Sequence, residues 1–431
     1  MPVPRSPRPI EIRTESPGAT AVPVPPQREL VRGDLVSSGR RLDDALVVVE
    51  GERVAWVGPA ADWAGADDDL PAAAPGRLIL PGLVDVHCHG GAGHGFPEAD
   101  ADGIRAAADH HLAHGTTTLL GSLVAAPADV LERRVAVLRS LVESGHLAGV
   151  HLEGPFLSVA RCGAQDPHAI VPGDPGLLRR LLDAGQGAVR SMTLAPETPR
   201  FADVVGVLTD AGGTPSLGHT DASAAQTTAA IAIAIAAAGG RPLGATHLFN
   251  AMPPLHHRAP GPVAACLAAA ARGAMVVELV GDGVHLAPET VATVFALVGA
   301  GQIALVTDAM AAAGMPDGRY PLGPMTVDVE RGVARLATGD GTQGAIAGGT
   351  ARLIDVLRRT VHDAGVPLTD AVTAATSTPA RLVGLDGEAG DVAVGRRADL
   401  LITDDDLLPR AVMRAGRWVG ETHPTGPREA R

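Results

Sequence analysis

Two histidines one residue apart follow an apolar stretch near residue 80. The segment Pro81-Gly-Leu-Val-Asp-Val-His-Cys-His-Gly90 reads as a buried strand over 78–86 that ends at His87 and His89. Because side chains alternate along a strand, the two imidazoles point to the same side. Such a pair at a strand end can bind a divalent metal, although two polar residues in an ordinary turn would give the same pattern.

Four further residues with suitable side chains directly follow apolar segments elsewhere in the chain: Glu153, His219, His247 and Asp308. A carboxylate and two imidazoles can bind one divalent metal and leave a coordination position for water. A second carboxylate beside such a site can act as a general base that later returns the proton to a leaving amine. Asp308 has the side chain and the placement for that base. Each residue alone could equally cap a loop or accept a hydrogen bond.

These side chains can meet only if a regular fold brings the ends of their strands together. Between the chain ends the sequence repeats a short apolar segment, a polar terminus and an Ala/Leu-rich helical segment, as over 127–143 and 288–300. The predicted strands are 78–86, 116–120, 148–152, 191–195, 214–217, 244–246, 275–279 and 303–306. Eight such units predict an α/β fold, a TIM-like (β/α)8 barrel, whose strand ends converge on one mouth.

The two ends of the chain differ from this repeat. Residues 1–27 are rich in Pro and lack apolar periodicity, which predicts a flexible tail. Short strands over 45–50 and 53–57 flank a tight turn, and 390–395 and 398–403 form another predicted pair. We expect residues 28–80 and 388–425 to form one small β-sandwich domain beside the barrel of residues 81–387.

Charge and composition exclude several classes of function. A net charge of −13 argues against nucleic acid or an anionic membrane as partner, while a small anionic substrate stays open. The chain contains no lysine, which excludes a Schiff-base lysine, a P-loop and a carboxylated-lysine metal bridge. Its three cysteines lack C-x-x-C or disulfide spacing, and no apolar segment has the length of a membrane span. We therefore expect a cytoplasmic protein.

Several motifs together resemble those of the N-acetylglucosamine-6-phosphate deacetylases of the amidohydrolase superfamily, from about residue 29 to residue 403. They are Pro81-Gly-Leu-Val-Asp85 with its two histidines, His151-Leu-Glu-Gly-Pro-Phe156, Gly218-His219, Thr246-His-Leu-Phe-Asn-Ala-Met252, Asp282-Gly-Val-His285, Val306-Thr-Asp308 and Ala398-Asp-Leu400. The resemblance implies a metal-dependent hydrolysis of N-acetylglucosamine 6-phosphate to glucosamine 6-phosphate and acetate, in amino-sugar catabolism and recycling.

The resemblance also implies a role for each matching residue. Glu153, His219 and His247 would hold the principal metal, and Asp308 would transfer the proton. His87 and His89 would admit a second metal bridged by Glu153, so that one or two ions per subunit stay open. Zinc is the expected ion, with iron, cobalt or manganese as alternatives. The implied phosphate-binding residues are Asn250, Ala251 and Arg258. The implied sugar-binding residues are Ala164, Gln165, Asp282, His285, Ile346, Ala347 and Gly348.

Arg258 makes physical sense in this role because a guanidinium binds phosphate oxygens bidentately, although a surface salt bridge would use the same side chain. Gln165 departs from the family pattern, which usually has His at this position, and it offers hydrogen bonds without charge. We expect a homodimer. An amidohydrolase acting on a cyclic amide or an N-acyl amino acid, and a non-catalytic sugar-phosphate binder, are the alternative functions.

Overall fold

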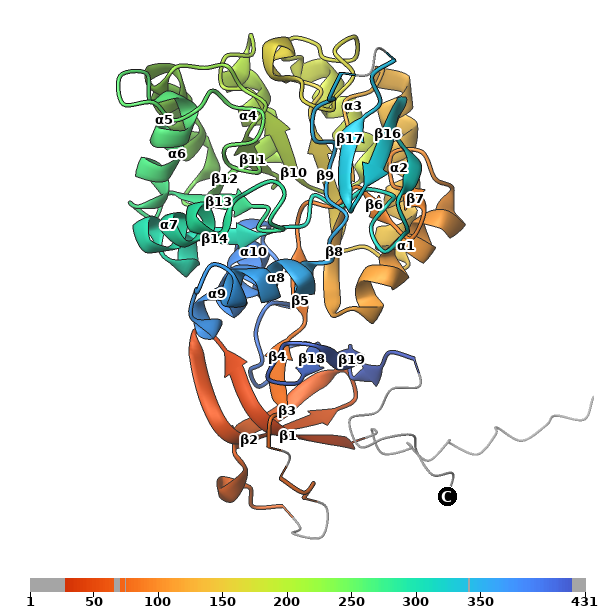
Figure 1. The fold of residues 1–431 in the computed structure, drawn as a ribbon, viewed down its shortest axis with the longest axis vertical. Coiled ribbons are helices and arrows are strands. Elements are labelled where there is room, and N and C mark those ends of the chain that lie inside the picture. The colour runs from red at the N-terminus through yellow and green to blue at the C-terminus, as the bar shows by residue number, and fades with distance from the viewer. Residues whose placement is uncertain (1–27, 66–69, 74, 340–341, 421–431) are drawn as a thin grey trace, which may run out of the picture.

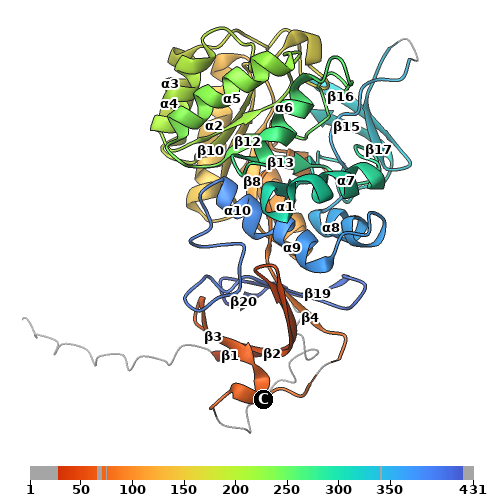
Figure 2. The ribbon, with the colours of Figure 1, turned by 90° about the vertical axis from the view of Figure 1, so that its left-hand side faces the viewer.

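The computed structural model describes residues 28–65, 70–73, 75–339 and 342–420. The predicted tail of residues 1–27 lies outside these ranges, as do residues 421–425 of the predicted small domain. A barrel forms the upper part of the molecule in Figures 1 and 2, and a separate sheet lies below it. Among the described residues, no helix is long and apolar enough to cross a membrane.

The barrel sheet has eight parallel strands in sequence order, which confirms the predicted TIM-like fold. The strands are β5 (Leu83–Asp85), β8 (Thr116–Leu123), β9 (Gly149–Glu153), β10 (Val189–Leu194), β11 (Thr214–Leu217), β12 (Leu243–Ala245), β13 (Met275–Leu279) and β14 (Ile303–Leu305). Nearly every residue in them is buried, because helices cover the outside and side chains fill the inside of a parallel barrel. This double burial is why the strands read as continuous apolar runs in the sequence.

Hydrogen bonds just beyond β5 and β14 join the first and last strands. The backbone N–H of Asp308 donates to the carbonyl of His87 at 2.9 Å, and that of His89 donates to the carbonyl of Ala309 at 2.6 Å. The Thr307 hydroxyl donates to the Asp85 carboxylate at 2.6 Å across the same seam. Residues more than 200 positions apart in the chain therefore lie side by side at the mouth of the barrel.

Ten helices occur among the described residues: α1 (Ala101–Ala113), α2 (Ala128–Glu143), α3 (Pro175–Gly185), α4 (Phe201–Asp210), α5 (Ala224–Ala238), α6 (Gly261–Ala270), α7 (Pro288–Val298), α8 (Leu353–His362), α9 (Leu368–Ala375) and α10 (Ser377–Leu382). Local sequence explains several starts. The Asp100 carboxylate accepts from the N–H of Gly103 to cap α1, and Ser223 and Gln226 form a capping box for α5. The described part of the chain also includes three 3-10 turns, η1 (Ala60–Asp62), η3 (Val159–Arg161) and η4 (Ala300–Gln302).

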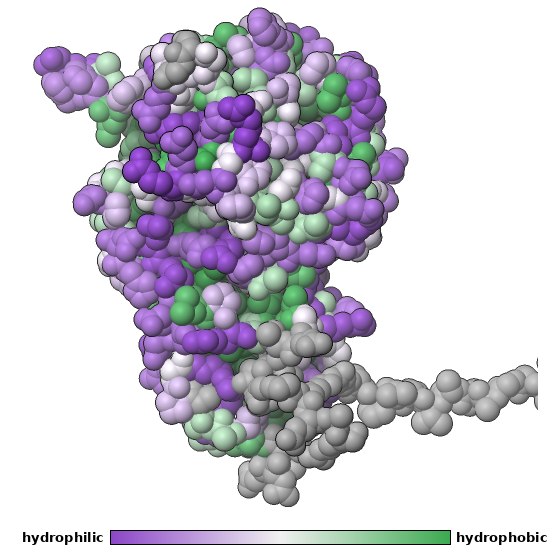
Figure 3. Space-filling model, turned by 45° about the vertical axis from the view of Figure 1, so that its right-hand side comes forward, coloured by the Kyte–Doolittle hydropathy of each residue, from purple (hydrophilic) through white to green (hydrophobic). Residues whose placement is uncertain are grey.

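The lower sheet is mixed and has seven strands in the order β20-β19-β18-β4-β1-β2-β3. From the N-terminal side come β1 (Arg28–Ser37), β2 (Arg40–Glu50), β3 (Arg53–Pro59) and β4 (Leu78–Pro81). From the C-terminal side come β18 (Leu400–Thr403), β19 (Pro409–Arg414) and β20 (Arg417–Trp418). Both chain ends build this part of the molecule, as the sequence predicts. Figure 3 shows hydrophilic side chains over most of the visible face, with hydrophobic ones gathered between barrel and lower sheet.

Two predicted strands differ in the structure. The strand predicted over 78–86 divides at Gly82 into β4 of the lower sheet and β5 of the barrel. A β-carbon at Gly82 would meet the Thr117 side chain, so only glycine fits where the chain passes between the two sheets. Residues 390–395 form no strand. The N–H of Val392 bonds to the side chains of Ser37 and Asp391 instead of to a neighbouring strand.

A small antiparallel sheet after β14 was not among the predicted elements. It consists of β15 (Gly318–Leu322), β16 (Met325–Glu330) and β17 (Val333–Leu336). Its apolar side packs on Val124, Met310 and Ala347 near the barrel mouth. The short pair β6 (Gly90–Gly91) and β7 (His94–Gly95) follows the two histidines.

Candidate active site

The structure brings the six candidate metal and proton-transfer residues together at the C-terminal end of the barrel. Glu153 is the last residue of β9, and the others lie within four residues of a strand end. They form two buried groups with metal-binding composition. One group is Glu153, His219 and His247, and the other is His87, His89 and Asp308.

In the first group, two imidazoles converge on one carboxylate oxygen. His219 Nε2 and His247 Nε2 each lie 3.0 Å from Glu153 Oε1 and 3.0 Å from one another. Zinc bound tetrahedrally at about 2.0–2.1 Å from nitrogen spaces its ligand atoms roughly 3.3 Å apart, which is comparable. The donor atoms, their spacing and their burial therefore fit a divalent metal.

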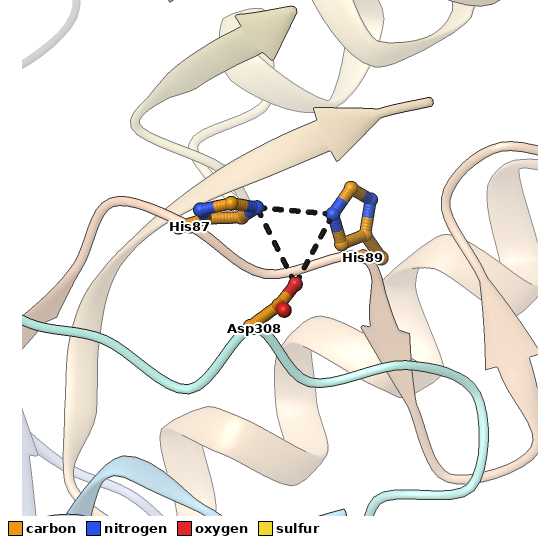
Figure 4. Close-up of side chains that lie close together, drawn as sticks. All are labelled: His87, His89 and Asp308. Atoms are coloured by element: carbon orange, nitrogen blue, oxygen red, sulfur yellow. Dashed lines mark hydrogen bonds and ion pairs between the residues drawn. The ribbon is translucent and has the colours of Figure 1, made fainter. Parts of the chain in front are cut away.

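In the second group, the carboxylate comes from the other side of the barrel seam. His87 Nε2 lies 3.1 Å from His89 Nε2, and each nitrogen lies 3.4 Å from Asp308 Oδ1, as Figure 4 shows. Sequence reasoning gave Asp308 a role only in proton transfer. In the structure the Asp308 carboxylate also completes a three-residue group with the two histidines.

Glu153 lies between the two groups. Its Oε1 is in the first group, whereas its Oε2 lies 3.2 Å from His89 Nε2. His87 Nε2 is 3.5 Å from Glu153 Oε1. One carboxylate thus contacts imidazoles of both groups, which is the placement of a residue that could bridge two ions.

The electrostatics of the site favour a cation. Burial alone would lower the pKa of His87, but the carboxylates of Asp308, Glu153 and Glu278 raise it to about 10. The pKa of His89 is raised to about 9, because the Asp308 and Glu153 carboxylates outweigh its burial. Despite burial, the imidazoles hold the pKa values of Glu153 and Asp308 below their usual ranges. Protons on the imidazoles therefore provide the positive charge beside these carboxylates. A divalent metal would provide that charge in their place, and its binding would release the protons.

Neighbouring acceptors orient two imidazoles so that Nε2 faces the group. His219 Nδ1 lies 2.9 Å from the carbonyl oxygen of Arg161, and His87 Nδ1 lies 2.9 Å from Glu278 Oε2. Glu278 also accepts from the backbone N–H of His247 at 3.1 Å. Sequence reasoning missed Glu278, although a buried acidic residue within the apolar strand β13 was a visible signal.

The backbone is strained at three of these residues. The φ angles of His219, His247 and Asp308 are +47°, +27° and +48°, in a region that residues other than glycine seldom adopt. Hydrogen bonds hold the chain there, including the one from the N–H of Gly349 to the carbonyl of Asp308 at 2.6 Å. Such strain is common at functional sites, because the surrounding structure fixes a side-chain direction that the backbone alone would not choose.

A cavity of about 220 Å³ opens onto both groups. Of the predicted substrate residues, those that line it are Ala164, Gln165, Asn250, Ala251, His285, Ile346 and Gly348. Asp282 holds His285, since its Oδ2 lies 2.8 Å from His285 Nδ1. His285 Nε2 lies 3.7 Å from Asp308 Oδ2. Ala347 is buried between two lining residues, and Arg258 is exposed and lies outside the cavity lining.

The chain matches the amidohydrolase family over residues 78–419. It is 33% identical to the N-acetylglucosamine-6-phosphate deacetylase of Bacillus subtilis (strain 168), over 76% of this chain and 81% of that protein. It is 32% identical to the N-acetylgalactosamine-6-phosphate deacetylase of Escherichia coli O157:H7, over 79% of this chain and 87% of that protein. A similar solved structure is that of an N-acetyl-D-glucosamine-6-phosphate deacetylase variant from Mycobacterium smegmatis in complex with N-acetyl-D-glucosamine-6-phosphate. Its TM-score to this chain is 0.84 and its sequence identity is 42%, over 91% of this chain and 99% of that chain. The chain therefore belongs to the N-acetylglucosamine-6-phosphate deacetylases of the amidohydrolase family.

Proposed function

We propose that this protein hydrolyses the acetamide of N-acetylglucosamine 6-phosphate to glucosamine 6-phosphate and acetate. The observation that carries the proposal is the pair of adjoining metal-binding groups, joined by the contact of Glu153 with His89, that line a cavity of substrate size. Membership of the family supports the choice of reaction. A non-catalytic binder would not need two buried carboxylates and four imidazoles that face one another.

The residues of the cavity suit amide hydrolysis. A divalent metal bound by these groups would polarise the amide carbonyl and make a water molecule more acidic. The Asp308 carboxylate lines the cavity, and we assign it the proton of the attacking water and the delivery of that proton to the departing nitrogen. His285, held by Asp282, lies beside Asp308 and is placed to donate a hydrogen bond to the substrate.

The metal is proposed to be zinc, with iron, cobalt or manganese as alternatives that the nitrogen and carboxylate donors also accept. We propose two ions per subunit, one in each group. Metal analysis of the purified protein tests the number and the identity together. A single equivalent would restrict binding to one group.

The phosphate is assigned to Asn250, Ala251 and Arg258. Asn250 and Ala251 line the cavity, while Arg258 is exposed outside it. We also propose a homodimer, which would let Arg258 reach the cavity of a second copy. The cytoplasm is the proposed location, because Cys88, Cys162 and Cys266 are all free thiols.

The test is acetate release from three substrates: N-acetylglucosamine 6-phosphate, N-acetylgalactosamine 6-phosphate and unphosphorylated N-acetylglucosamine. We expect the first to have the highest kcat/KM. The second is the alternative substrate, because the identity to the Escherichia coli N-acetylgalactosamine-6-phosphate deacetylase is nearly as high. Equal rates with and without phosphate would contradict the assignment of a phosphosugar substrate.

A further inference from the structure

A second cavity lies beside the one that contains the metal-binding groups. It has a volume of about 260 Å³. It lies between the β8–α2 segment, the residues before α1 and the β15–β16 turn. Most of its lining is apolar and includes Pro97, Leu123, Val124, Val130, Leu131 and Pro324. Its position and lining suit a short aliphatic group.

Val124 separates the two cavities. It lines the active-site cavity and the apolar cavity, and only 5% of its surface is exposed. The next residue, Ala125, donates its backbone N–H to Gln165 Oε1 at 2.7 Å, and Gln165 Nε2 donates to Glu153 Oε2 at 2.6 Å. Two hydrogen bonds therefore connect the backbone beside Val124 to the Glu153 carboxylate, which contacts both metal-binding groups.

The β15–β16 turn packs against Val124 and is itself held by a hydrogen bond. The carboxylate of Glu98 accepts from the backbone N–H of Gly323, in the β15–β16 turn, at 3.1 Å. A β-carbon at Gly323 would lie 3.0 Å from Val124 Cγ2, so the turn already packs closely on this side chain. Leu322, the residue before this glycine, also lines the active-site cavity. The methyl groups of Val124 thus separate the active-site cavity from the apolar cavity.

The assignments of the proposed function direct the acyl group of the substrate toward Val124. The scissile carbonyl must reach the metal-binding groups, and the phosphate is assigned to the side of Asn250 and Ala251. The alkyl group of the amide must therefore extend from the carbonyl away from the sugar. Val124 is an aliphatic residue that lines the active-site cavity near Gln165 and Glu153, where the alkyl group would lie.

We propose that Val124 limits the length of the N-acyl group that the enzyme accepts, and that the apolar cavity behind Val124 is an extension of the acyl-binding site that this side chain blocks. The inference rests on the proposed function. An acetyl group would end at Val124, whereas a propanoyl or butanoyl group would have to displace the valine. All three amides react with water to give a carboxylate and the same amine, so only the alkyl fit differs.

The test compares native protein and Val124→Ala on N-acetyl-, N-propanoyl- and N-butanoyl-glucosamine 6-phosphate. Release of glucosamine 6-phosphate is measured in each case, because this product is common to all three. One misplaced methylene in an apolar pocket changes kcat/KM by roughly 10- to 200-fold. We expect the native protein to prefer acetyl strongly, and Val124→Ala to raise the butanoyl-to-acetyl ratio of kcat/KM at least about tenfold.

Three further variants control the interpretation. Val130→Phe, added to Val124→Ala, should fill the apolar cavity and restore the preference for acetyl. Ile346→Ala enlarges the active-site cavity without opening onto the apolar one, so it should relax acyl selectivity less than Val124→Ala. If Val124→Ala does not fold, Val124→Ile tests the same wall with a larger side chain and should lower the propanoyl-to-acetyl ratio.

The outcomes separate this inference from the function on which it rests. An active Val124→Ala protein with the native acyl preference would overturn the role of Val124, as would an equal relaxation in Ile346→Ala. Native protein that hydrolyses none of the three amides would overturn the proposed function and this inference with it.

Discussion

Gln165 Nε2 lies 2.6 Å from Glu153 Oε2, while Gln165 Oε1 accepts a hydrogen bond from the backbone N–H of Ala125 at 2.7 Å. The amide therefore uses both ends to connect a metal-binding carboxylate to the barrel. This contact shows how Gln165 can serve at a position where the resemblance to the family leads us to expect His. Both side chains can donate a hydrogen bond to Glu153, and neither needs a charge to do so.

Gln165→Leu should weaken metal binding, because the Glu153 carboxylate loses the donor that orients it. Losing an outer hydrogen bond of this kind typically costs roughly 10- to 100-fold in metal affinity or activity. Affinity is measured by competition with a chelator of known strength. Gln165→His is the matched control and should stay near the native value. Equal affinity in Gln165→Leu and native protein would show that Glu153 needs no support from Gln165.

Asp308→Asn should lower kcat by about 10²- to 10⁴-fold, the usual effect of a positioned acid or base. Because Asp308 Oδ1 lies 3.4 Å from both His87 Nε2 and His89 Nε2, we also expect reduced metal in that group. Turnover and metal content are measured on the same sample. Full turnover in the Asn variant would mean that another residue transfers the proton.

Replacing His87 by Asn and His89 by Gln together should reduce the metal content from near two equivalents toward one. The group of Glu153, His219 and His247 keeps three donors without them. Replacing His219 or His247 should instead deplete the other ion. Elemental analysis after dialysis gives the ratio. A native protein with one equivalent would identify the His87 and His89 pair as hydrogen-bonding partners of the site.

Arg258→Ala should lower kcat/KM for the phosphorylated substrate about ten- to more than a hundredfold, since hydrogen bonds to charged groups contribute roughly 1.5–3 kcal/mol. The unphosphorylated sugar should be hydrolysed at the native rate. An equal loss on both substrates would make Arg258 a structural residue.

Because Arg258 lies outside the cavity of its own chain, mixed dimers can show which copy it serves. Arg258→Ala and Asp308→Asn subunits are unfolded together, refolded and assayed. If Arg258 reaches a second copy, the mixed dimer contains one complete site and activity returns. No recovery would confine Arg258 to its own chain.

Acidification should destabilise the fold through His111. Burial lowers the pKa of this imidazole to about 4, below the unfolded value near 6.5. Between these values the unfolded chain takes up a proton that the folded chain does not, so stability falls as pH falls from about 6.5 to about 4. The difference is on the order of 3 kcal/mol at the acid end.

The measurement is the shift in Tm between pH 6.5 and pH 4.5 for native protein and for His111→Gln, which keeps a donor for the Gly90 carbonyl. Both proteins are studied in chelator, so that loss of metal does not contribute. A smaller shift in the Gln variant is expected. Identical shifts would locate the acid sensitivity elsewhere.

The sequence by itself determined the barrel and most of its mouth. A parallel strand buried on both faces must be apolar throughout, so the polar residue at its end is visible without a structure. Glu153, His219, His247 and Asp308 follow this pattern. Their convergence follows from the architecture, because all strands of such a barrel point the same way.

Only the tertiary structure decided which of these residues face one another. His87 and Asp308 meet because hydrogen bonds beyond β5 and β14 close the barrel, and nothing local in either segment encodes that contact. The hydrogen bond of Gln165 to Glu153 and the place of Val124 between two cavities depend on loops and on the β15–β17 sheet in the same way. The apolar pattern of a strand in the sequence indicates that the strand is buried, whereas contacts between distant loops depend on how the whole chain packs.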